Sequence, residues 1–220
     1  QIEVVGDIAN TVWQLAEALD VPQPHWDFAF FDRVRTALCE NIAALAADER
    51  FPVHGPHLVK TLRDALDPHD VVCLDNGLYK LWFARNDRCR EPNTLLLDNA
   101  LATMGAGLPS AIAAKLVHAD RKIVAVCGDG GFMMNSQELE TAVRLKLDLV
   151  VIVLRDDAYG MIKWKQQHED YPVYGMDYGN PDFVRYAESY GARGHRPDSA
   201  AAFAGVLRSA LDAPGVDLID

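Results

Sequence analysis

The apolar run Ile123-Val124-Ala125-Val126-Cys127 leads directly into Gly128-Asp129-Gly130, and this stretch decides the fold. A second apolar run, Leu149–Leu154, ends just before the acidic pair Asp156-Asp157. The intervening segment Asn135–Leu145 has the sequence of a capped helix, so the whole stretch predicts a βαβ unit. Both strands of such a unit point the same way, and their carboxyl ends lie side by side. We therefore expect the two acidic turns on neighbouring strands, about 4.8 Å apart.

Two carboxylates in this position indicate a divalent cation. Asp129 and Asp156 offer oxygen ligands, which suit Mg²⁺, an ion that usually also takes oxygens from a substrate phosphate. The small residues Gly128, Gly130 and Gly131 allow the main chain to approach that phosphate. The first interpretation is a diphosphate held through Mg²⁺, although Asp-Gly is also a common turn sequence.

Phosphatases of the haloacid dehalogenase type carry a similar Gly-Asp-Gly. Their motif continues with Asn-Asp, where this chain has Phe132-Met133. They also need an upstream Asp-x-Asp nucleophile, and Asp75-Asn76-Gly77 lacks the second acid. This alternative is the weaker one.

The rest of the chain alternates between apolar runs and helical patterns. Such alternation predicts an α/β fold with a doubly wound, mostly parallel sheet flanked by helices, and ligands of these sheets bind at the carboxyl ends of the strands. The further strands are expected at Val71–Leu74, Ala192–His195 and Val216–Asp220. The further helices are expected at Arg33–Ala47, His57–Leu66, Met104–Val117, Asp182–Tyr190 and Ser199–Leu211. The segment Trp164–Pro181 has neither periodicity and is expected to be a loop.

Composition limits the class of protein. The net charge of −11 argues against a nucleic-acid surface, and no apolar run approaches the roughly 20 residues that span a bilayer. The four cysteines are far apart and form no Cys-x-x-Cys pair, so reduced thiols are expected. We expect a cytoplasmic protein whose partners include neither nucleic acid nor membrane.

The motif residues resemble those of thiamine diphosphate-dependent enzymes. Gly128-Asp129-Gly130, with Asp156 27 residues after Asp129, is similar to the cofactor motif of that superfamily. The longer string from Gly128 to Leu145 looks like the acetolactate synthase (acetohydroxyacid synthase) large-subunit branch. Asp75–Trp82 is similar to the segment that meets the diphosphate, and Asn99–Pro109 to the segment whose Met supports the bent cofactor.

The resemblance implies a set of site residues. Mg²⁺ would be bound by the side chains of Asp129 and Asp156 and the main-chain carbonyl of Ala158. Met104 would pack under the cofactor, although filling the core is its ordinary role. The cofactor-binding residues would be Gly77, Leu78, Tyr79, Ala102, Met104, Gly128, Asp129, Gly130, Gly131, Asp156, Ala158, Tyr159, Gly160 and Met161.

The resemblance also implies a reaction. Thiamine diphosphate with Mg²⁺ would serve to decarboxylate a 2-oxo acid, with pyruvate as the expected donor, and to condense it with a second 2-oxo acid to acetolactate. Lys165 stands where biosynthetic relatives have a Trp that favours 2-oxobutanoate, so that preference is not expected. Other decarboxylases, carboligases or oxidases of the superfamily, and a non-catalytic diphosphate-binding or oligomerisation module, stay open as alternatives.

The two ends of the chain suggest a segment of a longer polypeptide. It begins at Gln1 with the strand-like Ile2–Val5 and stops at the strand-like Val216–Asp220; an independent small protein is the alternative. The resemblance implies that residues 1–52 are the end of a central domain plus a linker, and that 53–220 form the C-terminal diphosphate-binding domain. The Glu that activates the cofactor would lie in a separate domain, so this chain would hold no catalytic residue and be inactive alone. A homodimer or homotetramer is implied, while FAD in the central domain and a small regulatory subunit stay open.

Overall fold

The computed structural model describes residues 4–19 and 27–220 and divides the chain into two compact units, Gln1–Asn41 and Ile42–Asp220. The first unit contains α1 (Ile8–Ala18), which begins where the Asp7 carboxylate accepts a hydrogen bond from the Asn10 N–H at 2.8 Å. The unit boundary falls within α2 (Ala29–Ala46). The strand expected at Ile2–Val5 lies partly outside the described residues, and Val4 and Val5 belong to no strand. The expected domain boundary at residues 52 and 53 stays a prediction.

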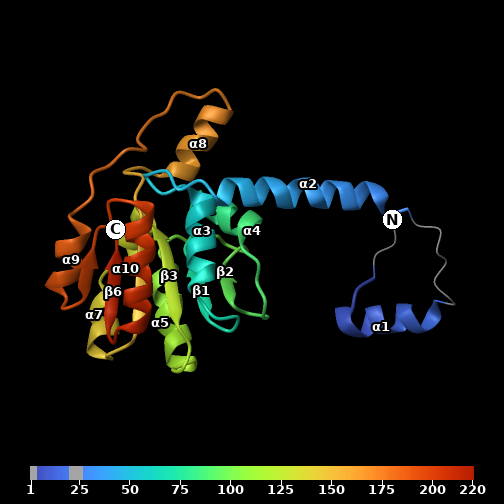
Figure 1. Cartoon of the computed structure of the whole chain (residues 1–220), viewed down its shortest axis with the longest axis horizontal. Coiled ribbons are helices and arrows are strands. Elements are labelled where there is room, and N and C mark those ends of the chain that lie inside the picture. Colours follow the sequence, from blue (N-terminus) through green and yellow to red (C-terminus); the bar gives the residue numbers. More distant parts are fainter. Residues whose placement is uncertain (1–3, 20–26) are drawn as a thin grey trace. The chain divides into compact units, whose positions relative to one another are not determined.

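A parallel sheet forms the centre of the second unit (Figure 1). In the described part of the chain it has six strands in the order β2-β1-β3-β4-β6-β5, and every neighbouring pair is parallel. The predicted α/β fold with a doubly wound sheet is confirmed. The strands are β1 (Val71–Leu74), β2 (Leu95–Leu97), β3 (Ile123–Gly128), β4 (Leu149–Leu154), β5 (Arg193–His195) and β6 (Val216–Ile219).

Helices cover both faces of the sheet, because successive strand residues point to opposite sides. Val72 and Leu74 of β1 pack with α3 (Gly55–Asp64), α4 (Lys80–Asn86) and α10 (Ala200–Asp212) in one core cluster. Cys73, between them, belongs to the cluster on the other face. The helices of that second face are α5 (Gly107–Val117), α6 (Asp129–Met134), α7 (Glu138–Arg144) and α9 (Phe183–Ser189). Strands buried on both faces explain the continuous apolar runs of the sequence.

Several predictions of local structure were wrong. Asp129, expected in a turn, begins α6 directly after β3, and the helix expected from Met104 begins at Gly107. The helix expected over Asn135–Leu145 begins only at Glu138, because the Asn135 amide donates to the Gly105 carbonyl at 2.8 Å instead of capping a helix. Trp164, where a loop was expected to begin, lies inside α8 (Gly160–His168), so the first residues of the expected loop are helical. No residue of α8 is buried, so the sequence lacks the apolar stripe from which a helix is recognised.

The strand order places a crevice at the carboxyl ends of β1 and β3. The chain leaves β1 toward β2 on one side, whereas it leaves β3 toward β4 on the other. This is the switch point at which doubly wound sheets bind ligands. Both acidic segments lie at this edge: Asp129 begins α6 directly after β3, and Asp156-Asp157 lie in the loop after β4.

Candidate functional site

A pocket opens at this switch point. It is lined by the turns after β1, β3 and β4 and by one residue from the α5 side, Met104. Of the fourteen residues expected to bind the cofactor, all except Ala102 line it. Ala102 is exposed and has a left-handed φ of 51°, so its role in cofactor binding stays a prediction. Asn76, Ile162 and Tyr178 also line the pocket and were not expected.

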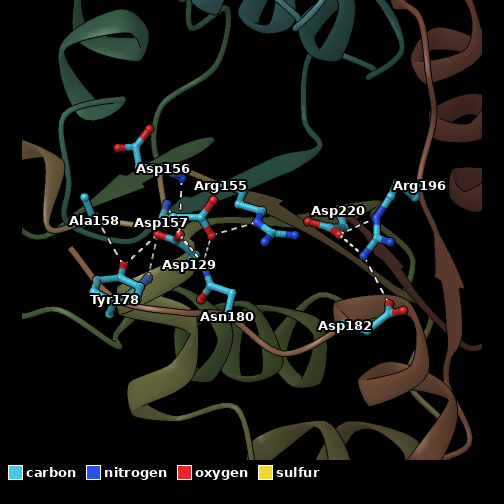
Figure 2. A network of polar contacts seen from close by, with 11 residues as sticks. Asp129, Arg155, Asp156, Asp157, Ala158, Tyr178, Asn180, Asp182, Arg196 and Asp220 are labelled. Carbon is cyan, nitrogen blue, oxygen red and sulfur yellow. Dashed lines mark hydrogen bonds and ion pairs between the residues drawn. The ribbon is translucent and has the colours of Figure 1, made fainter.

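The Asp129 carboxylate is the centre of the polar network at this edge (Figure 2). The residue is only 2% exposed, yet its two oxygens accept five hydrogen bonds. Main-chain N–H donors come from Gly130 at 2.8 Å, Asp157 at 2.7 Å and Asp156 at 3.2 Å. The carboxylate thus ties the turn after β3 to the turn after β4, as the βαβ argument required.

Asp156 presents the second carboxylate. Figure 2 shows it apart from the hydrogen-bonded group of Asp129, Tyr178 and Asn180. Burial, and then the charges of Asp129 and Asp157, raise the pKa of Asp156 above its ordinary value. A bound cation would offset this repulsion and favour the charged form of Asp156.

Asp157 has a role that the sequence did not indicate. Its φ of 52° is left-handed, and this conformation directs its N–H to Asp129. Its own carboxylate accepts hydrogen bonds from Arg155 Nε and Asn180 Nδ2, both at 2.8 Å. The hydrogen bond from Arg155 lowers the pKa of Asp157, so this carboxylate stays charged.

The pocket fits a diphosphate with a divalent cation. Tyr79, which lines the pocket, is 5% exposed, and its hydroxyl has no hydrogen-bond partner among the described residues. Such a buried donor calls for an acceptor oxygen. A Cβ on Gly128 would lie 3.0 Å from the Tyr79 ring, and one on Gly131 would lie 2.9 Å from the Asp75 carboxylate, so a side chain at either position would crowd this wall. Asp129, Asp156 and the Ala158 carbonyl supply the hard oxygen ligands that Mg²⁺ prefers. Within the described ranges, no three His, Cys, Asp or Glu side chains form a metal cluster.

Asp75 holds the Met104 side of the pocket in place. Its fully buried carboxylate accepts the N–H of Gly105 at 2.9 Å and that of Gly107 at 3.3 Å. Burial raises the pKa of Asp75, and these main-chain donors oppose the rise. The turn that carries Met104 is therefore fixed to the end of β1.

Tyr178 and Asn180 are site residues that the sequence did not reveal. The Tyr178 hydroxyl donates to Asp129 Oδ1 at 2.8 Å, and Asn180 Nδ2 donates to Asp129 Oδ2 at 2.6 Å. Burial, and then Asp129, raise the pKa of Tyr178, so its hydroxyl stays protonated. Both residues lie about fifty positions after Asp129, and no local pattern links them to it.

None of the helices in the described segments is long and apolar enough to cross a membrane. The parallel sheet and the glycine-lined, acidic pocket at its switch point define a diphosphate-binding α/β protein. Residues 75–220 match the family described as thiamine pyrophosphate enzyme, C-terminal TPP binding domain. The chain belongs to this family, which confirms the resemblance seen in the motifs.

Similar proteins carry related names. The chain is 38% identical over 220 residues to an acetolactate synthase of Bacillus subtilis (strain 168), covering 100% of this chain and 39% of that protein. It is 36% identical over 219 residues to a catabolic acetolactate synthase of Raoultella terrigena, and the match covers 97% of this chain and 39% of that protein. The fold is similar to that of a solved structure, the thiamine diphosphate-dependent 4-hydroxybenzoylformate decarboxylase of Rhodococcus jostii RHA1, with a TM-score of 0.71 and 26% sequence identity. The match covers 76% of this chain and 32% of that protein. The chain thus spans about two fifths of the length of these synthases.

Proposed function

We propose that this chain is the diphosphate- and Mg²⁺-binding part of an acetolactate synthase. The observation that carries the proposal is the pocket at the switch point, where an unpartnered Tyr79 hydroxyl shares the wall with Asp129 and Asp156. Acetolactate synthase names among relatives of 36–38% identity support the choice of reaction.

In this proposal the residues of the chain bind and orient the cofactor. The Asp129 and Asp156 carboxylates and the Ala158 carbonyl hold Mg²⁺, and the Tyr79 hydroxyl donates to a diphosphate oxygen. Gly128, Gly130 and Gly131 let the main chain approach the diphosphate, with Gly77 and Leu78 from the first turn. Met104 supports the cofactor from the α5 side, and the Asp75 carboxylate keeps its turn in position.

When bound, thiamine diphosphate supplies the carbon nucleophile for the 2-oxo acid and takes up the electrons released as carbon dioxide leaves. The described residues of the chain contribute the binding half of the site. The Glu that activates the cofactor belongs to another domain in this proposal, so residues 1–220 alone are inactive. The proposal also includes a homodimer or homotetramer, a small regulatory subunit, FAD in a central domain and a cytoplasmic location. The regulatory subunit is supported by relatives from Methanococcus aeolicus and Escherichia coli, which are named as large subunits.

The structural similarity to a 4-hydroxybenzoylformate decarboxylase favours one alternative, a decarboxylase that acts on an aromatic 2-oxo acid. Both functions are tested by supplying pyruvate or benzoylformate to the polypeptide that carries this chain together with a pyrimidine-binding domain. Acetolactate is measured as acetoin after acidification, and benzaldehyde by absorbance. Acetolactate from pyruvate supports the proposal, whereas benzaldehyde alone would replace it with the decarboxylase. Acetolactate formed by residues 1–220 alone would contradict the division of the site.

A further inference from the structure

The two oxygens of the Asp129 carboxylate have different surroundings. Oδ2 accepts three hydrogen bonds, from the N–H groups of Asp156 and Asp157 and from Asn180 Nδ2. A carboxylate oxygen has about two lone-pair sites, so Oδ2 is saturated by protein donors. Of the two oxygens, only Oδ1 could bind a cation in the pocket, once one of its own hydrogen bonds is released.

Oδ1 is also occupied by protein donors, and one of them is Tyr178. Oδ1 accepts the Gly130 N–H at 2.8 Å and the Tyr178 hydroxyl at 2.8 Å. The Ala158 carbonyl oxygen, the expected main-chain ligand, is in the same situation. It accepts the Gly160 N–H at 2.9 Å and lies 3.2 Å from the same Tyr178 hydroxyl. On both oxygens, the second lone pair faces Tyr178.

The main chain around Tyr178 is fixed to the turn after β4. Tyr178 N–H donates to the Asp157 carbonyl at 3.0 Å, and Tyr159 N–H donates to the Met176 carbonyl at 3.0 Å. The Tyr178 ring packs against the ring of Tyr159, with centroids 4.8 Å apart. A Cβ on Gly130 would lie 2.5 Å from the Tyr178 hydroxyl, so the glycine leaves the space that the hydroxyl fills. These contacts hold the main chain independently of the Tyr178 hydroxyl.

We propose that the Tyr178 hydroxyl competes with the divalent cation for Asp129 Oδ1 and the Ala158 carbonyl, and thereby sets the cation affinity of the site. The inference rests on the proposed function, because it uses the same two metal ligands. A Mg²⁺ ion binds oxygen at 2.0–2.1 Å and needs a lone pair from each oxygen, so binding requires both contacts of the Tyr178 hydroxyl to break. The main-chain donors, which define the turns, keep their hydrogen bonds.

Competition and support predict effects of opposite sign. If Tyr178 competes, removing its hydroxyl strengthens cation binding. If the hydroxyl instead helps to hold the cation or the turn, its removal weakens binding. A loss of affinity is the common result of damage to a site, so a gain is specific to competition.

The test compares the unchanged chain with Tyr178→Phe, which keeps the ring against Tyr159. Mn²⁺ is the probe, because it takes the same oxygen ligands and free Mn²⁺ is measured directly by electron paramagnetic resonance. A hydrogen bond to a charged acceptor corresponds to a factor of roughly ten to a hundred in an equilibrium constant. Because water also hydrogen-bonds the released hydroxyl, we expect Tyr178→Phe to bind Mn²⁺ on the order of tenfold more tightly.

Tyr186→Phe is the matched control. It removes a hydroxyl that bonds Ser136 at 2.8 Å and touches neither Asp129 nor Ala158, so its Mn²⁺ affinity should equal that of the unchanged chain. Circular dichroism of all three proteins verifies that they are folded. Saturable binding that is tighter only in Tyr178→Phe supports the inference. Equal or weaker binding in Tyr178→Phe, while the unchanged chain binds Mn²⁺, overturns the competition and leaves the cation site standing. Absence of binding in both proteins overturns the cation site itself, and the competition with it.

Discussion

Replacing Gly105 by alanine should destabilise the second unit, because two separate costs meet at this position. Gly105 has a φ of 85°, and left-handed backbone costs an alanine roughly 1–2 kcal/mol. Its added Cβ would lie 2.8 Å from Asn135 Nδ2 and 2.9 Å from Met134 Cβ, and overpacking of this kind costs about 1–3 kcal/mol. The reduced freedom of the unfolded chain returns about 0.4–1 kcal/mol. We expect a net loss of about 1–5 kcal/mol in the free energy of unfolding.

Two control substitutions separate these costs. Gly175 has a φ of 69° and no atom within 4 Å of an added Cβ, so Gly175→Ala should lose only about 1 kcal/mol. Gly107 has no left-handed φ, but its Cβ would meet Cys127 Sγ at 2.7 Å and Asp75 Cβ at 2.9 Å, so Gly107→Ala reports crowding alone. The free energy of unfolding is measured by urea titration followed by circular dichroism. Equal losses in Gly105→Ala and Gly175→Ala would refute the packing argument, and no loss in either would refute the left-handed conformation.

Two further predictions concern other parts of the second unit. Asp87→Ala should lower the free energy of unfolding by about 3–5 kcal/mol, measured by urea titration. The substitution leaves the buried Arg63 guanidinium without the carboxylate that it contacts at 2.8 and 2.9 Å. A loss below about 1 kcal/mol would mean that water reaches Arg63. The main-chain amides of α8 should exchange hydrogen much faster than those of β3 and β4, because no residue of α8 is buried. Their exchange should become slower when thiamine diphosphate and Mg²⁺ bind. If the amides of α8 are as protected as those of the strands in the ligand-free protein, the prediction is wrong.

The sequence predicted the centre of the sheet better than its surroundings. Val71–Leu74 and Leu149–Leu154 were predicted with the bounds that the structure has, because strands buried on both faces appear as uninterrupted apolar runs. β2 was missed, and its three residues are only partly buried; α8 was missed because it buries none. A short or exposed element leaves no periodic pattern to detect.

The site was predicted as far as its residues lie in turns next to strands. Asp129 and Asp156 were found because each follows an apolar run, and the topology brings such turns together. Tyr178 and Asn180 were missed because they reach Asp129 from a segment between α8 and α9, and only the folded chain shows the contact. The left-handed conformation of Asp157 was equally hidden, and the hydrogen bond from Asn180 to its carboxylate forms only in the folded chain.

We propose that Asp129 and Asp156 bind thiamine diphosphate through a divalent cation, and Asp156 offers the most direct test. Asp129 is less suitable, because its five hydrogen bonds also hold the two turns together. Thiamine diphosphate is titrated by calorimetry, with Mg²⁺ and with a chelator, into the polypeptide that carries this chain, as the unchanged protein, Asp156→Asn and Asp156→Ala. We expect Mg²⁺-dependent binding in the first two, because the amide oxygen still coordinates, and affinity weaker by more than about tenfold in Asp156→Ala, since even residues behind a metal ligand contribute that much. Binding that is unchanged in Asp156→Ala, or that does not depend on Mg²⁺, would contradict the claim.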